Sequence, residues 1–343
     1  MSDVRSRKDD QLYWASSPDA VMRQSTGLEG FRFQHQALPD LNLSEVNPQV
    51  DFLGWHLRVP ILISSMTGGT DEALRINANL ARAAQVVGVA MAVGSQRVAI
   101  QDPSCWDSFR VVREAAPDIV LFGNLGAVQL NYGLGAADVR ELVQGLGADG
   151  VFLHLNPLQE AIQEEGDTNF RGLLNKIGEV TRSVNFPVLV KEVGAGINPA
   201  LAVKLARQGV AAIDVSGAGG TSWAQIEGLR ASASGRKRLG TVFRDWGIPT
   251  VDALLACRRR LPEYPLIASG GIRNGLEVAK ALGLGADLVG MAGPLLKAAR
   301  ESVNAVVELL ESLSWELRIA MFASGAGDVG ALRRDGRLQP ILR

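Results

Sequence analysis

The sequence predicts an α/β fold in which eight parallel strands alternate with helices and close into a barrel. Eight short apolar runs recur along the chain, each ends in small or polar residues, and a stretch of helical periodicity follows each run. Their starts lie about 32 residues apart on average, the length of one βα unit. Strands covered by helices on both faces are near-continuous in Val, Ile, Leu and Ala, as these runs are. Eight such units close most economically into a (β/α)8 TIM barrel, with an open doubly wound sheet as the alternative.

Each expected strand is one of these runs. In chain order they are PILISSM from Pro60, VGVAMAVGS from Val87, IVLFGNLG from Ile119, GVFLHLN from Gly150, PVLVKEVG from Pro187, GVAAIDVSG from Gly209, PLIASGGI from Pro265 and ADLVGMAG from Ala286. Apolar residues at helical spacing predict helices over 72–86 and 201–208. The interval after the sixth strand is unusually long, and residues 217–247 within it are polar and basic with little apolar period. We therefore expect a long loop there, on the face where the strands end.

Two segments lie outside the barrel, which we place at residues 60–300 of a single domain spanning 1–343. Residues 1–59 begin with an expected mobile arm and include DFLGWHLRVP, whose apolar residues flank Gly54 like a hairpin that plugs the barrel bottom. Residues 301–343 contain C-terminal helices and a tail, and the pattern predicts a helix break at Ser314. We see no internal repeat beyond the βα period.

Composition excludes several classes of protein. The 35 Lys and Arg residues balance 36 Asp and Glu residues, so the chain lacks the positive field that attracts nucleic acid or anionic lipid. Hydrophobic residues make up 47% of the chain, which is enough to bury a large core. Cys105 and Cys257 lie in expected helices without zinc-type spacing, and the first residues are charged where a secretory signal is apolar. We expect a soluble, cytoplasmic protein that binds neither nucleic acid nor membranes.

Glycine-rich turns end the last expected strands. In (β/α)8 barrels the loops after strands seven and eight usually hold phosphate. SGGIR at 269–273 and MAGP at 291–294 carry glycine where backbone N–H groups must approach an anion, and SGAGGTSW at 216–223 extends this surface. Glycine at one such turn often serves only the backbone conformation of the turn, but glycine-rich turns after both of the last two strands predict a phosphate site. The phosphate could belong to a sugar phosphate, to pyridoxal phosphate or to flavin mononucleotide.

Other strand ends help to choose among these ligands. Lys191 closes the fifth strand, where it is either a cation beside the pyrimidine edge of a reduced flavin or a Schiff-base lysine. Polar groups without charge follow the first three strands and suit the edge of a flavin, although each one could merely satisfy loop backbone. These groups belong to Ser65, Met66, Thr67, Gly68, Ser95, Gln96 and Asn124.

The end of the fourth strand carries the most chemistry. HLNPLQE places His154, Asn156, Gln159 and Glu160 within seven residues, and the first two alternate along the strand, so both face the same way. A lone histidine in a strand is more often a packed core residue, but this one lies where barrels place their catalytic groups. Glu160 is either a ligand for Mg²⁺, which binds through one carboxylate plus substrate phosphates, or a solvated loop residue.

Three cations are candidate phosphate ligands. Arg7 and Lys8 lie in the N-terminal arm, and Arg97 follows the second strand. Arginine offers a planar fork to phosphate oxygens, whereas lysine acts as a point charge. Taken alone, a basic pair near the N-terminus is usually surface charge.

Together the motifs resemble the type 2 isopentenyl-diphosphate isomerases. The matching segments are RKDDQL (7–12), SSMTGG (64–69), VGSQR (93–97), GNLG (123–126), HLNPLQE (154–160), KEVG (191–194), SGAGGTSW (216–223), SGGIR (269–273) and MAGPLL (291–296). HLNPLQE with VGSQR is specific to that family among flavin barrels. The resemblance implies an isomerase of isoprene biosynthesis that interconverts isopentenyl and dimethylallyl diphosphate with reduced FMN and Mg²⁺. It further implies NADPH as the reductant and a homo-oligomer, a tetramer or octamer.

The same resemblance implies roles for single residues. The substrate would be held by Arg7, Lys8, Ser95, Gln96, Arg97, His154, Asn156 and Gln159. Glu160 would carry Mg²⁺, and Gln159, Trp223 and Glu227 would be catalytic, with Gln159 positioning the substrate or relaying a proton because an amide is a poor acid or base. The flavin ring and ribityl chain would contact Met66, Thr67, Gly68, Ser95, Asn124, Lys191, Ser216 and Thr221, and its phosphate would contact Gly271, Arg273, Ala292 and Gly293.

One position departs from the family pattern, and rival functions stay open. The family arm commonly carries His where this chain has Gln11, so we expect a contact with the diphosphate or the arm to be weakened. An FMN-dependent 2-hydroxy-acid oxidase or dehydrogenase is the main alternative, but its His-Gly-Gly-Arg motif is replaced here by GAGGTSW. A dehydrogenase with a loop cysteine nucleophile is disfavoured by the positions of both cysteines. A non-enzymatic flavin barrel would leave Gln159 and Glu160 without a purpose.

Overall fold

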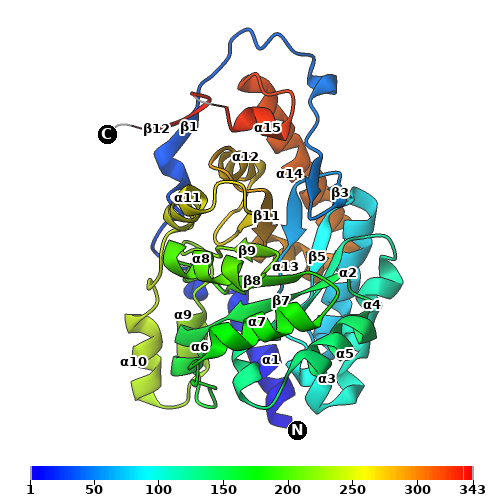
Figure 1. Cartoon of the computed structure of the whole chain (residues 1–343), viewed down its shortest axis with the longest axis vertical. Helices are drawn as coiled ribbons and strands as arrows, with labels where there is room; N and C mark the ends of the chain where they lie inside the picture. Colours follow the sequence, from blue (N-terminus) through cyan, green and yellow to red (C-terminus); the bar gives the residue numbers. More distant parts are fainter. Residues whose placement is uncertain (1, 335, 342–343) are drawn as a thin grey trace.

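Eight parallel strands close into a barrel in the computed structural model, which describes residues 2–334 and 336–341 (Figure 1). In chain order the strands are β4 (Ile61–Ile63), β5 (Ala90–Ala92), β6 (Leu121–Gly126), β7 (Gly150–Leu155), β8 (Val188–Glu192), β9 (Ala212–Asp214), β10 (Leu266–Ala268) and β11 (Leu288–Met291). The last strand pairs with the first, with Val289 opposite Ile61. Each predicted apolar run supplies one strand. The closed sheet confirms the predicted barrel and excludes the open, doubly wound alternative.

A hairpin closes the barrel at the amino ends of its strands. β2 (Val50–Phe52) and β3 (Trp55–Leu57) pair antiparallel around Gly54, whose φ of 89° is favourable only for glycine. Phe52 and Leu57 are buried in one apolar cluster with the first residues of the barrel strands, and the Trp55 ring meets Phe122 edge to face with centroids 5.8 Å apart. The hairpin lies where the sequence predicted one. It leaves the carboxyl ends of the strands as the open end of the barrel.

Helices cover the outside of the barrel between the strands. They are α2 (Asp71–Val87), α4 (Asp107–Ala115), α5 (Ala136–Leu146), α7 (Leu173–Ser183), α8 (Pro199–Arg207), α11 (Thr250–Arg260) and α12 (Gly275–Gly283), with α3 (Arg97–Gln101) and α6 (Pro157–Ile162) as short helices on strand ends. α2 shows why their bounds are sharp, because the Thr70 hydroxyl accepts a hydrogen bond from the Ala73 amide and Gly88 ends the helix at φ 80°. The helices predicted over 72–86 and 201–208 are confirmed within two residues at each end.

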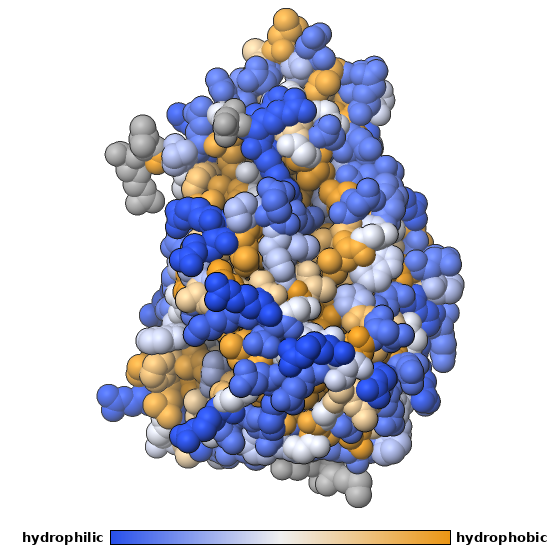
Figure 2. All heavy atoms as spheres, in the orientation of Figure 1, coloured by the Kyte–Doolittle hydropathy of each residue, from blue (hydrophilic) through white to orange (hydrophobic). Residues whose placement is uncertain are grey.

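The long connection predicted after β9 is present, but much of residues 217–247 is helical where the sequence predicted a loop. α9 (Trp223–Arg230) and α10 (Ser234–Val242) occupy most of it, and they pack closely where Gly228 meets Gly240. The buried face of α9 includes the polar Gln225 and Glu227, which is why apolar periodicity gave no signal. α10 leaves Val242 and Leu239 exposed at 63% and 42%, and Figure 2 shows apolar residues gathered over this helix at the lower left.

The N-terminal arm is a helix docked at the open end of the barrel, and the expected separate, mobile arm is wrong. α1 (Ser2–Ala15) packs against α9 at the lower end of Figure 1 and buries Leu12. Arg244 and Asp245 fasten the chain that follows, because the Arg244 guanidinium donates to the Val21 carbonyl at 2.6 Å and Asp245 accepts from the Arg23 amide at 2.6 Å. Polar residues surround nearly the whole helix, so its sequence carries no amphipathic pattern.

The C-terminal helices break at Ser302, not at Ser314 as expected. α13 (Gly293–Glu301) ends there, and the Ser302 hydroxyl caps α14 (Val303–Ala323) by accepting from the Ala305 amide at 3.1 Å. α15 (Val329–Leu332) and β12 (Leu338–Pro340) follow, and β12 pairs with β1 (Phe31–Phe33). Residue 1 of the expected arm and residues 335 and 342–343 of the expected tail lie outside the described residues. No helix in the part of the chain that the structure describes is both long and apolar enough to cross a membrane.

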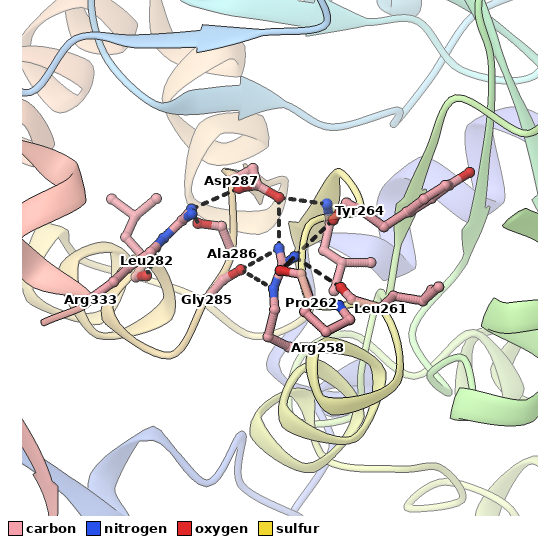
Figure 3. A network of polar contacts seen from close by, with 10 residues as sticks. Arg258, Leu261, Pro262, Tyr264, Leu282, Gly285, Ala286, Asp287 and Arg333 are labelled. Carbon is pink, nitrogen blue, oxygen red and sulfur yellow. Dashed lines mark hydrogen bonds and ion pairs between the residues drawn. The ribbon is translucent and has the colours of Figure 1, made fainter. Parts of the chain in front are cut away.

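A repeat that the sequence analysis overlooked fastens two pairs of neighbouring barrel strands. GLGAD occurs at 145–149 before β7 and again at 283–287 before β11. Figure 3 shows the second copy, where Arg258 of α11 donates to Asp287 at 2.7 Å. The same guanidinium donates to the carbonyls of Leu261, Pro262, Tyr264 and Gly285. Arg113 of α4 makes the equivalent contacts with Asp149 and the carbonyls of Ala116, Pro117, Ile119 and Gly147.

Replacing Arg258 by Met should lower the free energy of unfolding by about 2 kcal/mol. The change removes donors from four carbonyls and from Asp287, but the two charged side chains are 17% and 25% exposed, so water offsets part of the loss. The midpoint and slope of urea unfolding measure the change. Arg259→Met, at an exposed position on the same helix, is the matched control and should change stability by less than about 0.5 kcal/mol. Equal losses in the two variants would contradict the role of this contact set.

Candidate active site

A cavity of about 660 Å³ opens at the carboxyl ends of the barrel strands, within the range of roughly 300–1,000 Å³ typical of ligand sites. Its walls come from α1, from the strand ends and from the loops that follow them. Of the predicted site residues, those that line it are Arg7, Lys8, Met66, Thr67, Ser95, Arg97, Asn124, His154, Asn156, Gln159, Glu160, Lys191, Ser216, Thr221, Trp223, Gly271, Arg273, Ala292 and Gly293.

Three predicted residues lie behind this lining. A side chain at Gly68 would collide with the Phe109 ring, so glycine is required there for packing. Gln96 is fully buried, its amide donates to the Leu142 carbonyl at 3.2 Å, and its oxygen accepts from the Asn124 amide at 3.0 Å. The Gln96 side chain therefore braces the end of β6 and does not face a substrate. Glu227 lies behind Gln159.

Three cations gather at one side of the cavity. Burial and the nearby Arg7 and Arg97 charges lower the pKa of the Lys8 ammonium to about 8. The Nε of Arg7 is buried and has no hydrogen-bond partner in the part of the chain that the structure describes. Arg97 donates to Asp167 at 2.6 Å, and Gln129 holds the same carboxylate oxygen at 2.9 Å. A bound polyanion would stabilise this cluster, because it would balance the three positive charges and accept a hydrogen bond from the buried Nε of Arg7.

Glu160 lies beside these cations as a single buried carboxylate. One oxygen accepts from the Asp167 amide at 2.7 Å, and the other accepts from the Asn156 side chain at 2.9 Å. Burial raises the pKa of Glu160, and the contact with the Asp167 amide offsets part of that rise. Within 2–334 and 336–341, no group of three His, Cys, Asp or Glu side chains is placed to hold a metal ion. Glu160 thus suits an ion such as Mg²⁺ that keeps its water and takes its other ligands from phosphate.

Gln159 is held in one orientation by its neighbours. Its nitrogen donates to Glu227 Oε1 at 2.8 Å, and its oxygen accepts from the Asn156 side chain at 3.1 Å. Gln11 also donates to Glu227 Oε1 at 2.8 Å, and Arg230 donates to the second oxygen. Gln11 therefore ties α1 to α9 through Glu227, whereas the sequence placed it near a diphosphate or within the arm.

The floor of the cavity carries His154 and Lys191, which lie opposite each other on β7 and β8. His154 Nδ1 lies 2.7 Å from Asn124 Oδ1, and Asn124 donates to the Ser65 hydroxyl at 2.5 Å. Burial and the charges of Lys191 and Lys8 lower the pKa of His154 to about 3. The imidazole is therefore neutral near pH 7 and can contact an anion only as an uncharged hydrogen-bonding group. Burial also lowers the pKa of Lys191, whose ammonium donates to the Glu192 carbonyl at 2.6 Å.

Glycine-rich turns after β10 and β11 form another part of the cavity wall. Gly270 and Gly271 have φ of 102° and 75°, and a side chain at Gly271 would strike the Gly219 backbone. A side chain at Gly293 would meet nothing, and α13 begins there without a side-chain cap. The Gly293 amide is thus available to a bound anion, whereas Pro294 at the next position has no N–H to offer. Arg273 lines the same wall, and its guanidinium holds the turn by donating to the Gly271 and Gly219 carbonyls at 3.0 Å each.

Asp167 is a residue of the site that the sequence analysis missed. It joins Arg97, Gln129 and Glu160 through its side chain and its amide. It lies between α6 and α7, in a segment without apolar period, and a single aspartate in a loop carries no sequence signal of such a role. Only the fold brings its partners, from three different strand ends, to one place.

Comparison with known proteins points to one family. The FMN-dependent dehydrogenase family profile matches residues 141–339. An isopentenyl-diphosphate delta-isomerase from Synechococcus sp. is 55% identical to this chain, and the alignment covers 92% of this chain and 90% of the length of that enzyme. The enzyme of the same name from Nostoc sp. is 48% identical over 98% of this chain and 97% of its own. Among solved structures, a flavocytochrome b2 variant superposes with a TM-score of 0.71 at 20% identity over 98% of this chain and 84% of its own, a likeness of fold alone.

Proposed function

Since this chain belongs to the isopentenyl-diphosphate delta-isomerase family, we propose that it interconverts isopentenyl and dimethylallyl diphosphate, with FMN bound in the mouth of the barrel. The observation that carries this function is a single cavity with two separate anion sites. The cations Arg7, Lys8 and Arg97 line one part of the cavity, and the glycine turns around Gly271 and Gly293 line another. One site suits the diphosphate of a substrate and the other the phosphate of FMN. A 2-hydroxy acid carries one carboxylate and needs a basic histidine, whereas His154 has its pKa lowered to about 3.

The lining residues fit FMN at its ring as well as at its phosphate. The phosphate would take the Gly293 amide at the start of α13, with Ala292, Gly271 and Arg273 around it. The ring and ribityl chain would lie along the polar strand ends that the cavity exposes. These are Met66, Thr67, Ser95, Asn124, Lys191, Ser216 and Thr221. Gly68 would act only by letting this wall pack.

The reaction adds a proton to one carbon and removes a proton from another. Reduced FMN supplies an electron-rich ring that stabilises positive charge and a site near N5 that can hold a proton. Gln159 would orient the reacting carbons, because Glu227 and Asn156 hold its amide still. Trp223 lines the cavity at the first turn of α9 and offers an aromatic face to developing positive charge.

The diphosphate would lie against Arg7, Lys8 and Arg97, with Ser95, Asn156 and the neutral His154 as hydrogen-bonding groups. Glu160 would carry Mg²⁺ next to it. The unpartnered Nε of Arg7 supports the placement of the diphosphate, because a buried donor needs an acceptor. The unpartnered Oδ1 of Asn156 is an acceptor, and it suits Mg²⁺ or a water bound to Mg²⁺. Gln96 would support the site from behind by holding the Asn124 backbone.

Three further features rest on family resemblance. We propose NADPH as the reductant of the flavin, a cytoplasmic location, and assembly into a homo-oligomer of four or eight chains. The exposed apolar residues of α10, Val242 and Leu239, supply a surface that such assembly would cover (Figure 2).

Replacing Arg97 by Met tests whether the two anion sites are separate. The KM for isopentenyl diphosphate should rise by about 30-fold, the effect of losing about 2 kcal/mol of charged hydrogen bonding. The Kd for FMN, measured by quenching of flavin fluorescence, should stay within about a factor of two. Arg171→Met, an exposed arginine beyond α6, is the control and should leave both values unchanged. Equal weakening of FMN and substrate by Arg97→Met would show that one anion site serves both.

The depressed pKa of Lys8 predicts how substrate capture depends on pH. Below about pH 8 the ammonium is charged and attracts the diphosphate, and as pH rises through 8 the free protein loses that charge. The ratio kcat/KM, which reports the free protein, should therefore fall above about pH 8. Lys8→Arg should abolish this decline, since arginine stays charged. A wild-type profile that is flat between pH 7 and 9.5, or an unchanged decline in Lys8→Arg, would contradict the assignment.

A further inference from the structure

Asp214 is a buried carboxylate beneath the cavity that the proposed function leaves unused. It is the last residue of β9 and is fully buried. In the sheet register it lies directly opposite Lys191 on β8, which in turn lies opposite His154 on β7. Paired residues of parallel strands point to the same face, and the other two line the cavity, so all three point into the barrel. Three neighbouring strands thus place an acid, an ammonium and an imidazole in one layer.

Only one of the two carboxylate oxygens of Asp214 accepts hydrogen bonds among the described residues. Oδ1 accepts from the Ser269 hydroxyl at 2.7 Å and from the Ser216 amide at 3.0 Å, whereas Oδ2 is buried without a hydrogen-bond partner. Ser216 adopts φ of 40°, a left-handed conformation unusual for a residue other than glycine, at the turn where its amide meets Asp214. Both serines line the cavity, so Asp214 lies directly under the surface that a ligand contacts. A buried carboxylate with an unused oxygen is costly unless a cation balances it.

Lys191 is the cation placed to balance it. The charged and titratable groups around its ammonium are Asp214 on β9, Glu192 on its own strand and His154 on β7, with Lys8 beyond His154. Glu192 is already occupied, because one oxygen accepts the amides of Val193, Gly194 and Ala195. Among the described residues, the Lys191 and Asp214 side chains form no direct ion pair, so each charge acts on the other at longer range.

Protonation energetics agree with this geometry. Burial lowers the pKa of Lys191, and the Asp214 charge counteracts that shift. Burial likewise raises the pKa of Asp214, and the Lys191 charge counteracts it. Each charge therefore supports the other, and removing one favours the neutral form of its partner.

We propose that Asp214 is a positioning residue that keeps Lys191 cationic at the cavity floor and so sets the charge of the reduced flavin. The inference rests on the proposed function in one respect, namely that FMN occupies this cavity. A cation at the pyrimidine edge favours the anionic form of the reduced ring over the neutral form. Without the Asp214 charge, Lys191 releases its proton more readily and the reduced ring binds a proton more tightly.

The test compares the FMN-loaded protein with Asp214→Asn, which keeps the shape and removes the charge. Each protein is reduced with dithionite under anaerobic conditions, and absorbance is recorded against pH to find the midpoint between neutral and anionic reduced flavin. We expect that midpoint to rise by at least one pH unit in Asp214→Asn, a tenfold gain in proton affinity, and the reduction potential at pH 8 to fall. Asp252→Asn, at an exposed position on α11 that does not line the cavity, removes a carboxylate elsewhere, so its midpoint should match the wild type.

Lys191→Met closes a double-mutant cycle. It should raise the midpoint as Asp214→Asn does, and adding Asp214→Asn to it should have no further effect. Should Asp214→Asn fail to fold, Asp214→Ser, which retains a hydroxyl for the Ser216 amide, replaces it in the cycle. An unshifted midpoint in a folded, FMN-loaded Asp214 variant, or a further shift on the Lys191→Met background, overturns the inference while leaving the isomerase function intact. Failure of the wild type to bind FMN would instead overturn the proposed function.

Discussion

Replacing Glu160 by Gln is expected to lower the rate of isomerisation by about 1,000-fold at physiological Mg²⁺, the size of effect seen when a group that stabilises charge is removed. Among the described residues that line the cavity, Glu160 supplies the carboxylate next to the cation cluster, and Asp167 and Asn156 already orient its two oxygens. A glutamine keeps the shape but offers no negative charge to the ion. It also places amide hydrogens where one of these two donors points, which weakens the local hydrogen bonds as well.

The dependence of rate on Mg²⁺ concentration separates a lost metal ion from a disturbed loop. In Glu160→Gln, half-maximal rate should require at least tenfold more Mg²⁺ than in the wild type, within the range of effects expected at metal sites. Glu164→Gln, an exposed glutamate four residues on, is the matched control and should behave as the wild type. Because burial raises the pKa of Glu160, a proton competes with the ion as pH falls, so the wild-type requirement for Mg²⁺ should grow toward acidic pH. An unchanged Mg²⁺ requirement in Glu160→Gln would remove the metal role from this residue.

Replacing Gln159 by Leu is expected to lower kcat by about 100- to 1,000-fold while KM changes by less than about threefold. The amide contacts Glu227 and Asn156 rather than the cations, so its loss disturbs the reacting end of the substrate and spares the diphosphate. The fold should survive, because Glu227 keeps Gln11 and Arg230 as donors. Initial rates at varied isopentenyl diphosphate, with reduced FMN saturating, give both constants.

Gln11→Leu provides a graded comparison for the same network. It removes one of the two amides from Glu227 Oε1 but leaves Gln159 in place, so kcat should fall by about tenfold or less. A raised KM with an unchanged kcat in Gln159→Leu would show that the amide at 159 does not act at the reacting carbons. A larger decrease of kcat in Gln11→Leu than in Gln159→Leu would show the same.

The barrel could be predicted because its strands carry a strong and simple signal. Strands such as Leu121–Gly126 and Val188–Glu192 are buried on both faces, so their sequences are continuous in apolar residues and end abruptly in polar ones. The hairpin around Gly54 was predictable because apolar residues flank the glycine, and they can be buried only against the end of the barrel. α1 and α9 were missed because their buried contacts are largely polar, through Gln11, Gln225 and Glu227.

The candidate site was predictable as far as residues at strand ends, and less so beyond them. His154 and Lys191 lie on neighbouring barrel strands, so the fold brings them together regardless of the conformation of the loops that follow. The motifs at the strand ends therefore located the cavity. Which way a side chain turns from a loop was not predictable, and Gln96 turned away from the cavity to brace β6. Asp214 escaped notice because an aspartate at the end of one strand becomes meaningful only when the register sets it opposite a lysine on the next.

The most direct test of the proposed function follows the isomerisation of ¹³C-labelled isopentenyl diphosphate by NMR under anaerobic conditions, in the presence of Mg²⁺ and FMN. The experiment is run first with oxidised FMN and then with FMN that dithionite or NADPH has reduced. The proposed function predicts no conversion while the flavin is oxidised. Once the flavin is reduced, it predicts conversion to dimethylallyl diphosphate without net oxidation of either compound. Conversion that is independent of the flavin's redox state would contradict it, as would an FMN-loaded protein that leaves the diphosphate unchanged and oxidises 2-hydroxy acids in air.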